Sequence, residues 1–335
     1  MKAAVFHGEK DIKVEEVDDP IPGEGEVLLR PYYCGICGTD LDAWNRGMYA
    51  PGVVLGHEFS AHIVECGPGV SSWKKGDNVV VNSIIPCKNC AFCTNSMYSL
   101  CDNLEMPGIT VNGGLAELVV APADSLVLLP QSVNVKEAAL TEPLAVVLHG
   151  FGKITVQPGH TALVLGAGTI GLFALQVALL TGAYPVAVSE PNSFRRQTAA
   201  DLGAHPIDPT TSNVSFECEK VTNEPPDFII ECSGFAGAAS ETFSLAKKGG
   251  TILVLGLSED PVDADFMTAV LNELTFQFSY CGYAEFPSAV QLMAHKKVDV
   301  QSLITKIISL DDVVEKGFYE LMNPESDIVK ILVKI

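Results

Sequence analysis

The chain changes its hydrophobic pattern near residue 145. Beyond that point, short apolar runs alternate with segments of helical periodicity, which favours a parallel sheet with helices between its strands. The expected strands are 161–165, 185–189, 227–230 and 251–255. The expected helical segments are 169–180, 193–202 and 235–246. This part of the chain is therefore predicted to be an α/β domain built on a doubly wound parallel sheet.

Before residue 145 the pattern is typical of short strands. Alternating or β-branched runs lie at 12–17, 26–33, 59–64 and 78–81, with proline and glycine clusters between them. Such spacing favours a β-rich, irregular domain. The tail from about residue 284 returns to mixed elements and ends in an apolar strand, 328–333. We therefore divide the chain into 1–145, 146–283 and 284–335.

Composition and charge narrow the possible functions. The chain has 335 residues, of which 47% are hydrophobic and 19% charged, as in a globular protein large enough for two domains. Its net charge of −20 argues against a nucleic acid partner, because phosphate contacts are made mainly by lysine and arginine. We find no apolar stretch of about 18 residues for a membrane span, and no apolar signal-peptide core at the N-terminus. The expected location is the cytoplasm, where thiols stay reduced.

A glycine-rich segment follows the first strand of the α/β part. It reads Gly166-Ala167-Gly168-Thr169-Ile170-Gly171 and opens a predicted helix, which is the context a dinucleotide fingerprint requires. Gly166 permits the tight turn, Gly168 lets the backbone approach a pyrophosphate, and Gly171 allows close packing of helix on strand.

Glu190 ends the next apolar strand, where a carboxylate can bind the ribose hydroxyls of an adenosine and repel a 2′-phosphate. NAD is therefore expected in preference to NADP. The neighbouring Arg195 and Arg196 complicate this preference, because an arginine at this position can bind a 2′-phosphate. We count Arg195 among the expected coenzyme-binding residues.

Four cysteines crowd into one short loop, predicted at 86–102. They are Cys87, Cys90, Cys93 and Cys101. Thiolates at this spacing suit a closed tetrahedral zinc site, which supports folding and has no open position for chemistry.

A second group of possible metal ligands lies upstream of that loop. Cys34 and Cys37 form a Cys-x-x-Cys pair, which by itself fits either a redox pair or half of a zinc knuckle. His57 and Glu58 follow twenty residues later. No spacing rule connects Glu142 to this group.

The motifs together resemble one family. The similar stretches are Gly35–Asp40, Gly56–Glu58, the four-cysteine loop and Thr141–Pro143. In this order they resemble the zinc-containing medium-chain dehydrogenases, over nearly the whole chain. Within that family the match is nearest the polyol, threonine and butanediol branch. The segments most similar to 2,3-butanediol dehydrogenases are 303–305, 310–318 and 329–333.

The resemblance implies a GroES-like catalytic domain, a Rossmann coenzyme domain over 146–283, and a tail that returns to the catalytic domain. It implies two zinc ions in each chain. The catalytic zinc would be held by Cys37, His57 and either Glu58 or Glu142, and the structural zinc by the four loop cysteines. One carboxylate ligand would leave the catalytic site neutral, whereas a second would make it anionic and hinder ionisation of a bound alcohol.

The resemblance also implies oxidation of a small secondary alcohol to a ketone, with hydride transfer to the coenzyme. Thr39 would take the alcohol proton, and Glu58 belongs to the same catalytic group. Relatives commonly have a histidine three positions after this threonine, where this chain has Asp42. The end of the proton path is therefore either Asp42 or water.

Several alternatives stay open at the level of sequence. Threonine, sorbitol or a polyol phosphate are possible substrates, although the expected loop 40–49 has only Arg46 to attract a phosphate. A zinc-free reductase of the same fold would have no use for Cys37 and His57. A non-catalytic NAD-binding protein would be free to lose the zinc ligands, and none is lost here. Relatives form homodimers and homotetramers, so one of these assemblies is expected.

Overall fold

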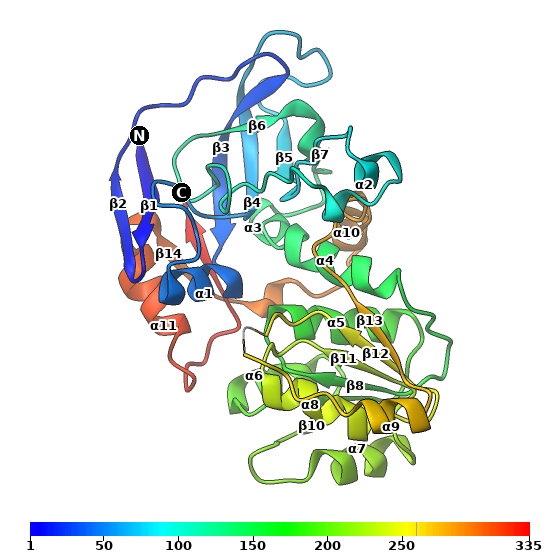
Figure 1. Ribbon diagram of the computed structural model, residues 1–335. Coiled ribbons are helices and arrows are strands. Elements are labelled where there is room, and N and C mark those ends of the chain that lie inside the picture. The colour runs from blue at the N-terminus through cyan, green and yellow to red at the C-terminus, as the bar shows by residue number, and fades with distance from the viewer. Residues whose placement is uncertain (259) are drawn as a thin grey trace.

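The structure is a computed structural model that describes residues 1–258 and 260–335. It contains one six-stranded sheet, one seven-stranded sheet and a separate two-stranded hairpin. Figure 1 shows the six-stranded sheet in the green and yellow body and the other two sheets in the blue and cyan body. The red C-terminal strand lies in the blue body, beside elements from the other end of the chain.

The six-stranded sheet is parallel throughout and has the order β10-β9-β8-β11-β12-β13. Its strands are β8 (Ala162–Leu165), β9 (Val186–Ser189), β10 (His205–Ile207), β11 (Phe228–Glu231), β12 (Thr251–Val254) and β13 (Thr275–Phe278). From β8 the chain forms β9 and then β10 on one side, and it then crosses back to form β11, β12 and β13 on the other side of β8. This order places a crevice at the carboxyl ends of β8 and its neighbours, where dinucleotides bind in such sheets. The predicted doubly wound sheet is confirmed.

Helices cover both faces of this sheet because its strands are apolar on both sides. The helices of this body are α5 (Thr169–Leu180), α6 (Ser193–Asp201), α7 (Val214–Thr222), α8 (Ala236–Leu245) and α9 (Phe266–Leu271). Ala162 and Val164 of β8 face a cluster with α5, whereas Leu163 and Leu165 face a second cluster with α7 and α8. The predicted strands and helices agree with these bounds to within one or two residues.

The seven-stranded sheet joins the two ends of the chain. Its strands are β3 (Glu26–Gly35), β4 (Glu58–Cys66), β5 (Asn78–Val81), β6 (Val119–Pro122), β7 (Leu126–Leu128), β14 (Ile304–Ser309) and β15 (Lys330–Lys334). The hairpin beside it consists of β1 (Lys2–Gly8) and β2 (Asp11–Glu16). Because β15 pairs with the end of β3, the C-terminal tail packs against residues 33–35, next to Cys37.

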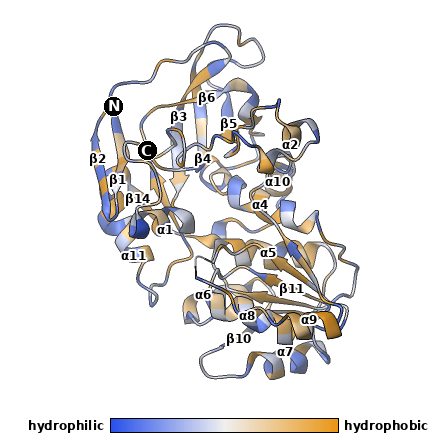
Figure 2. Cartoon of the chain, viewed as in Figure 1, coloured by the Kyte–Doolittle hydropathy of each residue, from blue (hydrophilic) through white to orange (hydrophobic). Residues whose placement is uncertain are grey.

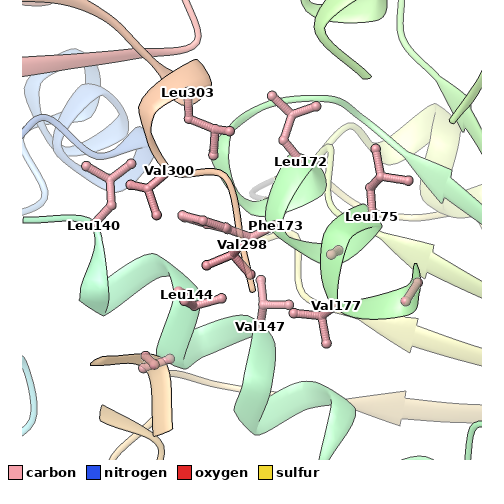
Figure 3. Packing of buried hydrophobic residues seen from close by; sticks show 14 of the residues in the cluster. Leu140, Leu144, Val147, Leu172, Phe173, Leu175, Val177, Val298, Val300 and Leu303 are labelled. Carbon is pink, nitrogen blue, oxygen red and sulfur yellow. The ribbon is translucent and has the colours of Figure 1, made fainter. Parts of the chain in front are cut away.

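A shared core connects the two bodies. The helices here are α3 (Val135–Ala138), α4 (Thr141–Phe151) and α10 (Phe286–Ala294). Figure 3 shows how α4 and α5 pack together against the segment 298–303. The labelled side chains are Leu140, Leu144, Val147, Leu172, Phe173, Leu175, Val177, Val298, Val300 and Leu303. The helix α4 runs through residue 145, where we placed a domain boundary, so the boundaries at 145 and 283 stay predictions.

One local expectation was wrong. The segment 40–49 was expected to be a loop, but most of it belongs to α1 (Gly38–Arg46). The backbone N–H of Cys37 donates to Asp40 Oδ2 at 2.9 Å, which caps the helix start, and Gly47 ends the helix with φ 68°. Two further short helices are α2 (Ala91–Thr94) and α11 (Tyr319–Leu321). Among the described residues, no helix is both long and apolar enough to cross a membrane.

Candidate metal centres and coenzyme site

The four loop cysteines come together around one point. The Sγ atoms of Cys87, Cys90, Cys93 and Cys101 all lie within 4.8 Å of one another, as a four-thiolate metal site needs. Hydrogen bonds from the backbone N–H groups of Asn89 and Cys93 lower the pKa values of Cys87 (to about 6) and Cys90, respectively. These backbone donors stabilise two of the thiolates, whereas burial raises the pKa of Cys93 to about 12. The close approach of the four Sγ atoms is what fits a tetrahedral zinc ion.

A second group gathers where β3 ends and β4 begins. Ligand atoms of Cys37, His57 and Glu58 lie within 4.8 Å of one another. Cys37 directly precedes α1, while Glu58 is the first residue of β4 and pairs with Gly35 of β3. His57 and Glu58 are buried, with 4% and 1% exposure. A soft sulfur, an imidazole and a carboxylate fit a catalytic zinc, with a fourth position left for another ligand.

Gly35 makes room for Glu58. A Cβ atom on Gly35 would lie 2.1 Å from Glu58 Oε2 and 3.3 Å from Glu58 Cβ. Any larger side chain would therefore displace the carboxylate. The position of Glu58 therefore requires a residue without a side chain opposite it in the β3–β4 pairing, and Gly35 is that residue.

The surroundings of His57 stabilise positive charge. Its Nδ1 lies 3.7 Å from Oδ1 of the buried Asp40. Neither atom has a hydrogen-bond partner within the part of the chain that is described. Burial lowers the pKa of His57, but Asp40 and Cys37 together outweigh it, so the net pKa is well above its ordinary value. A pocket that favours a cation in this way suits a metal ion beside the imidazole.

Glu142 lies at the start of α4 and faces the same group. Its carboxylate accepts a hydrogen bond from Ser83 Oγ at 3.1 Å on Oε1. Its net pKa is raised to about 7, mainly by burial, while the charge of His57 lowers this pKa and the charge of Glu58 raises it. Glu142 is not among the three residues whose ligand atoms lie within 4.8 Å of one another.

Sequence reasoning missed Lys330, the first residue of β15. Its side chain is buried and bonds to Glu58 at 2.8 and 2.9 Å. The available signal was a single lysine inside the apolar run 328–333. Such a lysine needs a buried partner, because an unpaired buried charge is very costly.

Thr39 and Tyr49 have buried hydroxyls close to the Cys37 group. Within the described residues, neither hydroxyl makes a hydrogen bond of standard geometry, but Thr39 lies near enough to Tyr49 to lower the pKa of that hydroxyl. Burial raises the pKa of Tyr49, and Asp40 raises it further.

The other predicted residues near this site have different surroundings. Trp44 packs against Phe318, with ring centroids 5.7 Å apart. Asp42 lies on α1 and is half-buried. Cys34 is fully buried, and burial raises its pKa well above the ordinary value.

The glycine fingerprint forms the turn between β8 and α5. Gly166 has φ 92°, a conformation that side chains disfavour, and a Cβ on Gly171 would lie 1.9 Å from Gly166 O. A Cβ on Gly168 would meet nothing within 4 Å, so its surroundings have room for a ligand. Thr169 and Ile170 begin α5, whose N-terminal amides are suited to bind a phosphate. The turn fits a dinucleotide.

Glu190 and the two arginines are also engaged in the protein itself. Glu190 accepts hydrogen bonds from Ala167 N at 2.6 Å and Asn192 N at 2.9 Å. Its carboxylate therefore supports the fingerprint backbone and retains lone pairs for a ribose.

The Arg195 Nε donates to Ile328 O at 2.8 Å. Arg196 donates to Glu190 O at 2.6 Å and pairs with Asp208 at 2.9 Å. Both arginines thus have protein partners beside the expected adenosine site.

Sequence comparisons identify the relatives of this chain. Family models match residues 23–131 (alcohol dehydrogenase GroES-like domain) and residues 169–295 (zinc-binding dehydrogenase). The chain is 34% identical to L-threonine 3-dehydrogenase of Pyrococcus abyssi, with 92% of this chain and 91% of that protein covered. It is 32% identical to (R,R)-butanediol dehydrogenase of Bacillus subtilis, with 100% and 99% covered. It is 31% identical to sorbitol dehydrogenase of Gallus gallus, with 99% and 96% covered.

Solved structures agree with these sequence matches. The fold is similar to that of 2R,3R-butanediol dehydrogenase from Bacillus subtilis, with TM-score 0.91 at 30% identity over 100% of this chain and 99% of that one. A protein of Sinorhizobium meliloti, described as a zinc-binding dehydrogenase bound to NADP, gives TM-score 0.93 at 32% identity over the same shares. The chain therefore belongs to the zinc-containing medium-chain alcohol and polyol dehydrogenases, oxidoreductases that depend on zinc and a nicotinamide coenzyme.

Proposed function

We propose that the chain transfers a hydride between NAD and a secondary alcohol, and that this alcohol is a vicinal diol or polyol such as 2,3-butanediol. The strongest support is the group formed by Cys37, His57 and Glu58, with the Thr39 hydroxyl close by. Cys37, His57 and one glutamate would hold the catalytic zinc. Cys87, Cys90, Cys93 and Cys101 would hold the structural zinc.

Each residue around the catalytic centre would have a separate role in the reaction. When bound, the zinc supplies Lewis acidity that eases ionisation of the substrate hydroxyl. The Thr39 hydroxyl would accept the proton and pass it toward the coenzyme ribose, ending at Asp42 or water. Asp40 faces His57 Nδ1 and would keep the ring oriented, as carboxylates beside metal-binding histidines do. The buried surroundings exclude water and strengthen these interactions.

Glu190 supports a preference for NAD. Its carboxylate lies beside the fingerprint turn, where a second negative charge on a 2′-phosphate would be repelled. The protein partners of Arg195 and Arg196 reduce their availability for such a phosphate.

The substrate class rests on the relatives, since butanediol and sorbitol dehydrogenases both match at over 30% identity. L-threonine is the main rival, from a relative at 34%. A phosphorylated polyol is less favoured because Arg46 is the only basic residue in 40–49, which also contains Asp40 and Asp42.

A substrate panel tests the proposal. The zinc-replete protein would be assayed for reduction of NAD and NADP with 2,3-butanediol stereoisomers, sorbitol, L-threonine and simple secondary alcohols. We expect the highest kcat/KM with a diol or polyol and NAD. If L-threonine is the only compound turned over, the diol or polyol assignment is wrong and L-threonine is the substrate. A preference for NADP would contradict the role of Glu190.

We further propose that two copies of the chain pair through the edge of the six-stranded sheet. Among the described strands, β13 pairs only with β12, so its outer edge is open. The neighbouring α9 is strongly apolar in Figure 2, and Phe266, Val270 and Leu271 are 73–74% exposed. An open edge beside an exposed apolar helix is a surface that proteins usually cover.

The assembly can be measured by light scattering. Val270→Glu should shift a dimer toward monomer, or a tetramer toward a smaller species. Ile21→Glu is the matched control, because Ile21 is 87% exposed and lies in a different part of the chain. A monomeric wild-type protein, or an unchanged mass for Val270→Glu, would contradict this interface.

A further inference from the structure

Lys330 occupies an unusual position for a lysine. Its residue is 3% exposed, and its ammonium donates to Glu58 Oε2 at 2.8 Å and to Glu58 Oε1 and Ile36 O at 2.9 Å each. These acceptors flank Cys37 and belong to the segments that carry the catalytic group. All three hydrogens of the ammonium can therefore be satisfied inside the site.

The sheet fixes this position from the far end of the chain. Strand β15 pairs antiparallel with β3, with Leu332 opposite Gly35 and Val333 opposite Cys34. The backbone N–H of Ile36 donates to Ile331 O at 3.2 Å, which continues the contact beyond the end of β3. This register brings Lys330 to the point where the chain turns from β3 toward Cys37. A shift of one residue would point the lysine to the other face of the sheet.

The charges of the site explain why a cation is needed there. A Zn²⁺ ion is balanced by one thiolate and one carboxylate, here Cys37 and Glu58. Two further buried carboxylates, Glu142 and Asp40, would leave the centre with a net negative charge. Lys330 supplies a positive charge that offsets part of it. Each carboxylate oxygen of Glu58 has two lone pairs, so it can accept from Lys330 and still bind a metal.

We propose that Lys330 is a positioning residue of the catalytic metal centre. It holds Glu58 beside Cys37 and His57, so that Glu58 is the third protein ligand, and it offsets the charge of Glu142. The proposal deepens the proposed function, since it concerns the same metal centre. A purely structural ion pair would stabilise the fold without changing how tightly this centre binds metal.

Metal binding provides the test, measured as chelator competition on the purified full-length protein. The four-cysteine loop would hold its own zinc and would serve as an internal reference. Lys330→Met should weaken the affinity of the Cys37 centre about 10- to 100-fold, the usual effect of losing a partner of a metal ligand. The loop zinc should be unchanged. Lys330→Arg should recover part of the affinity, and Lys334→Met, an exposed lysine of the same strand, should bind both ions as the wild type does.

Cobalt substitution adds a spectroscopic readout of the ligand set. Glu58→Gln should alter the visible absorption of Co²⁺ in the Cys37 centre, whereas Glu142→Gln should alter it much less. The double variant Glu58→Gln with Lys330→Met removes both charges, so it leaves no unpaired buried ion if Lys330→Met alone fails to fold. It should bind metal no more weakly than Glu58→Gln alone.

Two results would overturn the proposal. One is wild-type affinity of the Cys37 centre in Lys330→Met or in the double variant. The other is a Co²⁺ spectrum that responds to Glu142→Gln and not to Glu58→Gln. Neither readout depends on turnover, so a protein inactive on every alcohol would refute the proposed function and leave this test valid.

Discussion

The two candidate metal centres of this chain are built in opposite ways. The four-cysteine centre takes all its ligands from one short loop, with the help of α2. The Cys37 centre draws on β3, α1, β4, α4 and β15, and its lysine and glutamate are 272 residues apart. The first centre needs only its loop to close, whereas the second needs the seven-stranded sheet to be complete.

The centres also stabilise charge differently. In the loop, backbone N–H groups lower the pKa values of Cys87 and Cys90. In the Cys37 centre, side chains of opposite charge face the buried groups: Lys330 bonds to Glu58, and Asp40 faces His57. Backbone donors come with the loop conformation, but buried ionic partners must each be placed by tertiary structure. We therefore expect the Cys37 centre to be far more sensitive to distant substitutions.

The largest contrast should come from removing one cysteine ligand in each centre. Cys37→Ser should reduce kcat/KM by more than about 100-fold, because it removes a metal ligand rather than an outer partner. The variant should remain folded and keep one zinc in each chain, measured by elemental analysis and circular dichroism. Loss of both zinc ions would contradict the independence of the two centres.

Removing a cysteine from the four-cysteine loop is expected to affect folding before it affects catalysis. Cys93→Ser leaves three thiolates in the loop, so the structural zinc should be lost and the free energy of unfolding should fall by several kcal/mol, since metal binding contributes directly to folding. Denaturant unfolding measures this change. Any protein that stays folded should still bind zinc at Cys37. Undiminished stability with the loop zinc absent would show that the loop is not a structural centre.

The sequence predicted the local features of this protein well. Residues close in the chain, such as Cys87 and Cys101 or Gly166 and Gly171, show their relation by spacing, and the helix expected at 169–180 has those bounds in the structure. Spacing did not reveal the partners of His57 and Glu58, because Asp40 and Lys330 are brought to them by a helix cap and by strand register. The lone lysine in the apolar run 328–333 indicated that it needs a buried partner, but only the whole fold shows that this partner is Glu58.

Gly35→Ala tests the assembled centre without changing a ligand. The added Cβ would lie 2.1 Å from Glu58 Oε2, so the carboxylate must move. We expect metal affinity at the Cys37 centre to fall about 10- to 100-fold, as when a supporting partner is lost, and the loop zinc to stay. Gly38→Ala is the matched control, because a Cβ there meets nothing within 4 Å. Equal affinity in both variants would show that the centre tolerates displacement of Glu58.

The smallest effect is expected at Asp42, the position where relatives commonly have histidine. If water completes the proton path, Asp42→Asn should change kcat within about threefold, whereas Thr39→Val should lower it by about 10²–10⁴-fold, the range for a lost proton-transfer group. Stopped-flow measurement of NADH formation separates the chemical step from product release. A loss of about 100-fold in Asp42→Asn, with both zinc ions retained, would instead make this carboxylate the end of the path. The Cys37 centre would then include Asp42 of α1 as well as Thr39. Proton transfer, like metal binding, would then depend on the tertiary structure that brings these elements together.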